Sequence, residues 1–223
     1  MKLETYPDRE FLMLGLANTI AGQLADFLRR EGKATLSVPG GTTPGPIFDT
    51  LSGVDLDWAN VAVVLNDERW VPESSERSNT RLLRERLLRG RAAQARLVPL
   101  YAPAEQPEEM LEALEDGLRP HLPISVLLLG MGADMHTASL FPGADRLQEA
   151  LSASAPLLLP MRAEAAGEPR ITLTAPVLRG AFNIHVLITG AEKRAALERA
   201  MTLTPMEAPV RAVLDNATVH WAE

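Results

Sequence analysis

Residues 130–143 read Gly-Met-Gly-Ala-Asp-Met-His-Thr-Ala-Ser-Leu-Phe-Pro-Gly and follow the mostly apolar stretch 124–129. That stretch has the length and composition of a buried strand. The two closely spaced glycines let the backbone turn sharply where the strand ends. We therefore expect Asp134, His136 and Ser139 at the carboxyl edge of a sheet, where open α/β sheets bind ligands. The alternative interpretation is an ordinary strand-to-helix turn with a surface histidine.

Strand-like and helix-like segments alternate along the rest of the chain. Asp8 is a suitable N-cap for a long amphipathic helix, whose apolar residues recur at helical spacing from Phe11 until Gly32. Pro44 is well placed to begin a second helix. The alternation is typical of βαβ units, and it predicts an α/β fold. The expected strands are 34–38, 61–65, 124–129 and 181–188, and the further expected helices are 77–88, 111–118 and 191–201.

Composition limits the class of protein. The 223 residues, 46% of them hydrophobic, suit one sizeable core, and we expect a single domain over residues 1–223. The absence of cysteine excludes disulfides, thiolate zinc sites and a cysteine nucleophile. The first eight residues lack the pattern of a signal peptide, and no continuous apolar run approaches the roughly 18 residues of a membrane span. These features predict a cytoplasmic protein without a membrane partner.

The net charge of −7 argues against a general affinity for nucleic acid, because binding there depends on neutralising phosphates. An anionic small molecule could still bind at a locally basic pocket. The segment 39–44, Pro-Gly-Gly-Thr-Thr-Pro, is one candidate, because its glycines and the following helix start can present N–H groups to a phosphate. No lysine follows and the dinucleotide spacing is absent, so it is neither a Walker loop nor a Rossmann fingerprint. A plain tight turn is the alternative.

Three further segments carry charged residues that chemistry could use. Residues 66–72 read Asn-Asp-Glu-Arg-Trp-Val-Pro and place two carboxylates and an arginine at the end of a buried strand. Lys193, one of only three lysines, lies at an expected helix start, and Arg170 lies in Pro-Arg-Ile-Thr-Leu-Thr. Both residues could instead be ordinary solvated side chains. The histidines at 121, 185 and 220 lie beside prolines or in apolar runs, which favours structural roles.

Together, the segments GGTTP (40–44), NDERWVP (66–72, followed by Ser78 and Asn79), GMGADMHTASLFPG (130–143), PRITLT and GAEK resemble the 6-phosphogluconolactonase family. The resemblance extends from residue 37 to residue 193. It implies a Rossmann-like open, mostly parallel sheet with helices on both faces, similar to glucosamine-6-phosphate deaminase. It also implies hydrolysis of 6-phosphoglucono-δ-lactone to 6-phosphogluconate in the oxidative pentose phosphate pathway, without a cofactor.

The resemblance makes His136 the general base that removes a proton from the attacking water. An imidazole with the ordinary pKa of about 6.5 is mostly neutral at cytoplasmic pH and suits this task. Asp134 would orient the imidazole, and Arg69 or nearby backbone N–H groups would stabilise the oxyanion. Asp67 occupies the place where the related deaminases keep a proton-abstracting carboxylate, so it belongs to the same candidate site.

The phosphate of the substrate is expected on the loop formed by Gly40, Gly41, Thr42 and Thr43, with positive charge from Arg170 and Lys193. We expect no metal, although Asp67, Glu68, Asp134 and His136 could in principle hold a divalent ion, because lactone esters react readily with a base and an oxyanion site. The expected partner is a phosphorylated sugar lactone, and the expected assembly is a monomer or weak homodimer.

The chain departs from the family pattern at Met135, where glycine is usual, and a side chain there is expected to disfavour a positive φ. Two other functions remain open. A sugar-phosphate deaminase would pair its histidine with a glutamate shortly after it, at the position that Phe141 occupies here. A non-catalytic sugar-phosphate-binding regulator would keep Gly40, Gly41 and Lys193 without needing His136.

Overall fold

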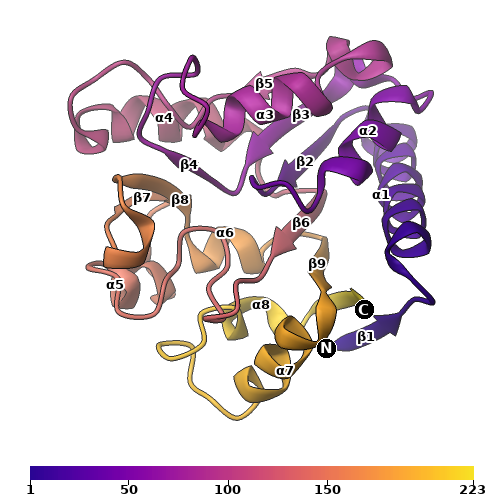
Figure 1. Cartoon of the computed structure of the whole chain (residues 1–223). Coiled ribbons are helices and arrows are strands. Elements are labelled where there is room, and N and C mark those ends of the chain that lie inside the picture. Colours follow the sequence, from indigo (N-terminus) through magenta and orange to yellow (C-terminus); the bar gives the residue numbers. More distant parts are fainter.

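The computed structural model describes the backbone of residues 1–223 and every side chain except that of Ala165. Its larger sheet has seven strands, all parallel to their neighbours, in the order β1-β10-β9-β6-β2-β3-β5 (Figure 1). The smaller sheet is antiparallel, in the order β4-β8-β7. The bounds are β1 Lys2–Thr5, β2 Ala34–Val38, β3 Val61–Leu65, β4 Asp67–Arg69, β5 Arg96–Val98, β6 Val126–Gly130, β7 Leu158–Met161, β8 Arg170–Leu173, β9 Asn183–Thr189 and β10 Ala217–Ala222.

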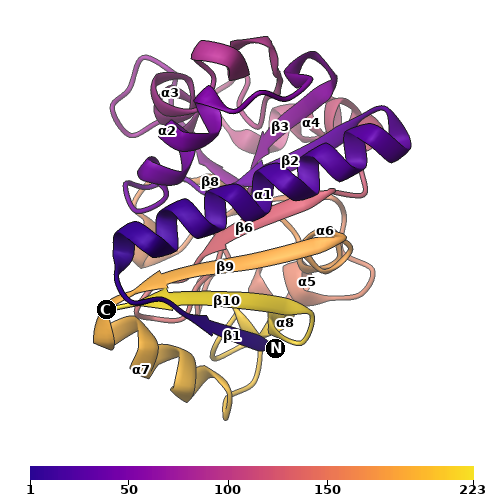
Figure 2. The same ribbon diagram turned by 90° about the vertical axis from the view of Figure 1, so that its right-hand side faces the viewer.

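Helices cover both faces of the larger sheet. Figure 2 shows α1 crossing in front of the strands, with α5 and α6 behind them. The fold class predicted from the sequence, a mostly parallel open α/β sheet, is therefore confirmed. The bounds are α1 Arg9–Glu31, α2 Gly45–Gly53, α3 Asn79–Arg86, α4 Leu111–Leu118, α5 Leu147–Leu151, α6 Ala175–Arg179, α7 Gly190–Ala200 and α8 Arg211–Leu214, with a short 3-10 helix, η1, at Trp58–Asn60.

The long first helix has the ends that the sequence predicts. Asp8 accepts a hydrogen bond from the backbone N–H of Phe11 at 2.9 Å and so caps the N-terminus. Gly32 adopts the left-handed conformation, with φ of 68°, and its N–H bonds to the Leu28 carbonyl. The fully buried residues of α1 recur at helical spacing, as Leu12, Leu16, Ile20 and Leu24 do. This face packs on the sheet and anchors the helix there.

By length and composition alone, α1 could also cross a membrane, because one continuous stretch of this helix has a mean hydropathy of 1.4. The sequence interpretation missed this, since polar residues such as Asn18 and Gln23 interrupt the apolar run while the average stays high. The buried face of α1 lies against the protein core, and this packing accounts for its apolar residues.

The strand order creates a crevice at the edge that carries the predicted site. From β2 the chain continues to β3 and β5 on one side, and then returns to form β6 on the other side of β2. At such a switch in direction, the loops that leave the two central strands diverge, and ligands bind between them. The glycine loop (residues 39–44) follows β2 and the histidine loop (residues 130–143) follows β6, so both leave the sheet at this switch point.

The remaining differences from the sequence prediction concern short strands and the short helices α5, α6 and α8, which were not predicted. Residues 66–72 were expected only as the charged end of a buried strand, but 67–69 form β4, which pairs with β8. The strands β1, β5, β7, β8 and β10 were not predicted. Three of them are only three or four residues long at a sheet edge, where pairing with a neighbour outweighs the weak pattern of the segment itself.

Candidate active site

The histidine loop holds an imidazole and a carboxylate in contact. His136 Nδ1 lies 2.6 Å from Asp134 Oδ1, and this hydrogen bond is the largest effect that lowers the pKa of Asp134. An ionised carboxylate only accepts, so Nδ1 carries the proton and donates. The lone pair of the neutral ring is then at Nε2, for which no protein partner is recorded among the described residues. The His136 side chain is 32% exposed, so this nitrogen can meet water.

Gly132 makes room for this pair. A Cβ at position 132 would overlap the imidazole of His136 and the carboxylate of Asp134. The backbone turns tightly here, because the N–H of Gly132 bonds to the His136 carbonyl and the N–H of Met135 bonds to the Gly132 carbonyl, both at 3.0 Å. Gly130, by contrast, has open space where a Cβ would lie. The second glycine of the motif is therefore the one that the site geometry requires.

The loop contains two non-glycine residues with positive φ, Met135 at 67° and Ala138 at 49°. Met135 was expected to disfavour this conformation, but the structure places it there. Its carbonyl accepts a hydrogen bond from the N–H of Val210 at 3.1 Å, and Thr137 Oγ1 donates to the Gly130 carbonyl at 2.8 Å. These bonds hold the strained turn, which costs roughly 1–2 kcal/mol at a residue with a side chain.

A buried polar group connects this loop to the smaller sheet. Ser139 Oγ donates to Asp67 Oδ2 at 2.5 Å, and Arg170 Nη1 lies 3.5 Å from the same oxygen. All three residues are buried. The Asp67 carboxylate is therefore occupied by the protein itself, and the group holds the strands β4 and β8 against the histidine loop.

Phe141 lies between the imidazole and Arg170. Its ring centroid is 4.4 Å from that of His136, with the planes at 35°, and the Arg170 guanidinium carbon lies 5.7 Å from the ring centroid. An aromatic face attracts a cation, so the ring helps to hold the Arg170 guanidinium, and it also packs against the neutral imidazole. The sequence interpretation used Phe141 only to argue against a deaminase, and nothing in the local pattern indicated this contact.

Arg69 and Arg170 lie directly opposite each other in the β4–β8 ladder. Burial lowers the pKa of Arg170, the charge of Asp67 opposes this shift, and the charge of Arg69 adds to it. The Nε atoms of both residues are buried without a hydrogen-bond partner in the part of the chain that the structure describes. Two like charges in this position repel each other. An anion bound between or beside them would remove the repulsion and satisfy free donors.

The glycine loop is shaped by Asn79 and by Glu68. A Cβ at Gly40 would overlap the Asn79 side chain, and Gly41 has a φ of 80°. Glu68 is fully buried and accepts from the backbone N–H of Asn79 and Thr80 at 2.8 and 2.7 Å, so it orders the start of α3. Sequence reasoning did not assign roles to Glu68 and Asn79. The run Ser78-Asn79-Thr80 before a helix was the signal that could have indicated them.

Lys193 lies in the first turn of α7, directly after β9, at the same edge of the sheet. The structure records no hydrogen bond or ion pair for its side chain within the described part of the chain. Thr42 and Thr43 lie on the glycine loop just before α2.

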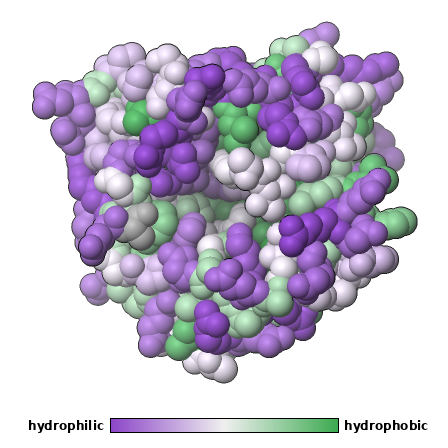
Figure 3. Space-filling view, viewed as in Figure 1, coloured by the Kyte–Doolittle hydropathy of each residue, from purple (hydrophilic) through white to green (hydrophobic). Residues whose placement is uncertain are grey.

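Figure 3 shows the face of the molecule that carries this edge of the sheet, which is hollowed between its upper and lower parts. Within the described residues, no cluster of His, Asp or Glu has the arrangement of a metal site.

Comparison with known proteins shows which family this chain resembles. The family model described as glucosamine-6-phosphate isomerases/6-phosphogluconolactonase matches residues 7–221. The 6-phosphogluconolactonase of Mesorhizobium japonicum is 44% identical over 97% of this chain and 93% of its own, and that of Pseudomonas aeruginosa is 44% identical over 93% and 89%. A crystal structure of a 6-phosphogluconolactonase from Shewanella baltica superposes with a TM-score of 0.96 at 33% identity, covering 100% of this chain and 98% of that one.

Proposed function

The chain belongs to the glucosamine-6-phosphate isomerase/6-phosphogluconolactonase family, and we propose that it hydrolyses 6-phosphoglucono-δ-lactone with His136 as the general base. Its relatives identify it as a lactone-hydrolysing enzyme. The observation that supports the mechanism is the His136–Asp134 pair over Gly132, which leaves Nε2 open to water. A cytoplasmic location, the absence of nucleic-acid and membrane partners, and a monomer or weak dimer remain predictions.

In the proposed reaction, Nε2 of His136 takes a proton from a water molecule while the water oxygen bonds to the lactone carbonyl carbon. Asp134 stabilises the imidazolium that forms, because it already accepts from Nδ1. The tetrahedral oxyanion is stabilised by Arg69 or by backbone N–H groups. The ring C–O bond then breaks, and the imidazolium returns its proton to the departing ring oxygen. The products are the free acid and a regenerated neutral histidine.

We assign the phosphate to the side of the crevice formed by Gly40, Gly41, Thr42 and Thr43, with Arg170 and Lys193 supplying charge. The opposed pair Arg69 and Arg170, each with an unsatisfied Nε, supports an anion site here. A protein of net charge −7 attracts a dianion only through such local groups. Binding energy from this end holds the carbonyl in position for attack.

The two other functions differ from this one in testable ways. A deaminase would pair its histidine with a glutamate shortly after it in the chain, but that position is Phe141, whose ring packs against the imidazole. A non-catalytic regulator would bind the sugar phosphate without needing the ordered pair of His136 and Asp134. The contacts made by these three residues therefore favour the lactonase.

The decisive assay follows hydrolysis of freshly prepared 6-phosphoglucono-δ-lactone, with the spontaneous rate subtracted. We expect an enzyme-dependent rate far above background, and no release of ammonia from glucosamine 6-phosphate. Binding of 6-phosphogluconate without acceleration would support the regulator and contradict our proposal. Ammonia release would instead support the deaminase. Exhaustive chelation is expected to leave the rate unchanged, because no step uses a metal.

The phosphate assignment has its own test in Lys193→Ala. Loss of a charge-assisted hydrogen bond that persists through the reaction should raise KM, by roughly tenfold to a hundredfold, with a smaller effect on kcat. Gluconolactone without phosphate serves as the matched substrate. If the variant discriminates between the two lactones as strongly as the wild type, Lys193 does not contact the phosphate.

A further inference from the structure

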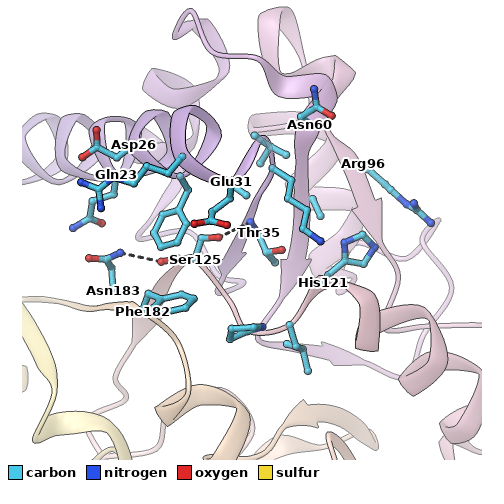
Figure 4. A pocket seen from close by; sticks show the side chains of 18 of the residues that line it. Gln23, Asp26, Glu31, Thr35, Asn60, Arg96, His121, Ser125, Phe182 and Asn183 are labelled. Carbon is cyan, nitrogen blue, oxygen red and sulfur yellow. Dashed lines mark hydrogen bonds between the residues drawn. The ribbon is translucent and has the colours of Figure 1, made fainter.

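A cavity of about 790 Å³ lies at the amino edge of the seven-stranded sheet (Figure 4). It is lined by the first residues of several strands, including Ala34 of β2, Val61 of β3 and Arg96 of β5. The candidate active site lies at the carboxyl edge, and a five-residue strand separates the two edges by roughly 17 Å. No residue of the proposed lactonase site lines this cavity. The cavity is therefore unexplained by the proposed reaction.

One end of the cavity is aromatic. The rings of Phe27 and Phe182 lie 5.3 Å apart between centroids, with their planes at 44°. Phe182 is 64% exposed, which is unusual for so large an apolar side chain. Figure 4 shows it at the side of the cavity opposite His121. An exposed ring at a cavity wall provides a flat surface on which a planar group can stack.

The other end is basic. Lys33 and Arg96 line it, and the structure records no ion pair or hydrogen bond for either side chain among the described residues. Most other arginines of this acidic protein do have carboxylate partners. His121 lies beside them, and burial together with the charges of Arg96 and Lys33 lowers its pKa. Unpartnered cations around a cavity favour the binding of an anion.

Hydrogen-bonding groups lie between the two ends. Thr35 and Ser125 are buried, and Ser125 Oγ accepts from the backbone N–H of Thr35 at 3.0 Å. No acceptor within the described residues is recorded for either hydroxyl hydrogen. The Glu31 carboxylate lines the same part of the cavity without an ion-pair partner. These groups can donate to and accept from the polar edge of a planar ring.

We propose that this cavity is a second ligand site for a small organic anion with a planar ring, of the nucleoside monophosphate type. The ring stacks on Phe182, its polar edge meets Thr35, Ser125 and Glu31, and its anionic group is held by Lys33 and Arg96. The aromatic wall and the cations lie at opposite ends of the cavity, as the base and the phosphate lie at opposite ends of such a molecule. This site is independent of the lactonase reaction and does not rest on it.

Calorimetric titration of the full-length protein with AMP and with GMP tests the proposal. Saturable binding of one molecule per chain is expected for at least one of them, with a Kd below about 1 mM. Inorganic phosphate alone and the nucleoside alone are expected to bind more weakly than the nucleotide, because each reaches only one end of the cavity. Equal affinity for phosphate alone would show that the aromatic end takes no part, and would overturn the proposal.

Two variants with matched controls locate the site. Phe182→Ala should weaken nucleotide binding by about tenfold through loss of stacking. Phe11→Ala, which removes a phenyl group that is 62% exposed outside the cavity, should leave it unchanged. Lys33→Ala should weaken binding by about tenfold or more. Arg91→Ala, which removes an exposed charge paired with Asp55, is the charge control.

Other outcomes exclude the cavity as the site. Displacement of the nucleotide by 6-phosphogluconate would place it at the carboxyl edge. No saturable binding by either nucleotide would overturn the proposal outright. A change of oligomeric state in Phe182→Ala without ligand would show instead that this face is covered by a second copy of the chain.

Discussion

His136 and the pair formed by His185 and His220 are histidines in opposite environments. His136 is 32% exposed, and a single carboxylate holds one of its nitrogens. His185 and His220 are 4% and 1% exposed and form a chain of hydrogen bonds. His185 Nε2 bonds to Gln23 Oε1 at 2.8 Å, His185 Nδ1 to His220 Nε2 at 3.0 Å, and His220 Nδ1 to the Tyr6 hydroxyl at 2.9 Å.

The difference shows what makes a histidine available for chemistry. In the buried pair every ring nitrogen has a partner, and burial lowers the pKa of both residues to about 4. These rings therefore stay neutral and serve as fixed cross-links between α1, β9, β10 and the N-terminal segment. At His136 the carboxylate of Asp134 satisfies Nδ1 alone, so Nε2 remains free to exchange a proton with water. One environment supports stability, and the other supports reaction.

The largest effect is expected from His136→Ala. Removal of a general base costs at least about 100-fold in kcat. Because the side chain lies at the surface of the loop, the urea midpoint of unfolding should stay near that of the wild type. Steady-state kinetics on the phosphorylated lactone measure the kcat, and urea denaturation in parallel measures the midpoint of unfolding. Activity near the wild-type level would contradict the assignment.

The buried pair predicts a loss of stability in acid. In the unfolded chain, histidine has a pKa of about 6.5, whereas in the native state both values are about 4. Between these values the unfolded state binds protons that the native state does not, so the free energy of unfolding decreases as pH falls below 6.5. At pH 5 the expected loss is about 2 kcal/mol for each histidine. Above pH 6.5 both histidines are neutral in the unfolded chain as well, so they no longer reduce the free energy of unfolding there.

Urea unfolding at pH 7.5 and pH 5.0 measures this loss. The double variant His185→Gln/His220→Gln should lose clearly less stability between the two pH values than the wild type. An equal loss in both proteins would assign the acid sensitivity to other groups.

The sequence predicted the elements with strong local patterns and missed several short strands, some at a sheet edge and some, such as β8, inside a sheet. The strands β2 and β3 and the helix α1 were correct because each has a strong pattern of its own, from the fully apolar β3 and the largely apolar β2 to a capped amphipathic helix. The strands β4 and β8 were missed because Asp67, Arg69 and Arg170 are charged, and only their neighbours in three dimensions make such residues strand-forming. Pairing across more than 100 residues leaves no local signal.

The same reasoning applies to the candidate site. The proximity of Asp134 to His136 followed from their spacing on one loop, and the structure confirms that contact. The enclosure of Asp67 by Ser139 and Arg170 joins segments that are far apart in the sequence, so no motif could indicate it. The roles assigned to Arg69, Lys193 and the glycine loop remain predictions.

A smaller effect than that of His136→Ala is expected from Gly132→Ala. The new methyl group would overlap the imidazole and the carboxylate, so the pair must shift while the fold remains. A displacement of about 1 Å at a catalytic group costs on the order of 100-fold in rate, and we expect a loss of tenfold to a hundredfold. Gly130→Ala is the matched control, because a methyl group there meets open space. Equal kinetics for the two variants would show that the contact over Gly132 is unimportant.

The smallest effect is expected from Met135→Gly, which tests the strain in the histidine loop. Glycine adopts the positive φ of residue 135 without the cost of roughly 1–2 kcal/mol that a side chain incurs. Two effects oppose this gain and lower the free energy of unfolding. Glycine has greater freedom in the unfolded chain, and the packing of Met135 on the core is lost. These terms nearly cancel, so the free energy of unfolding should change by less than about 1 kcal/mol. The kcat should stay within a few-fold, since the hydrogen bond between His136 and Asp134 does not involve this side chain. A large loss of rate with unchanged stability would show that the methionine itself positions the base, and that the exposed histidine depends on packing as the buried pair does.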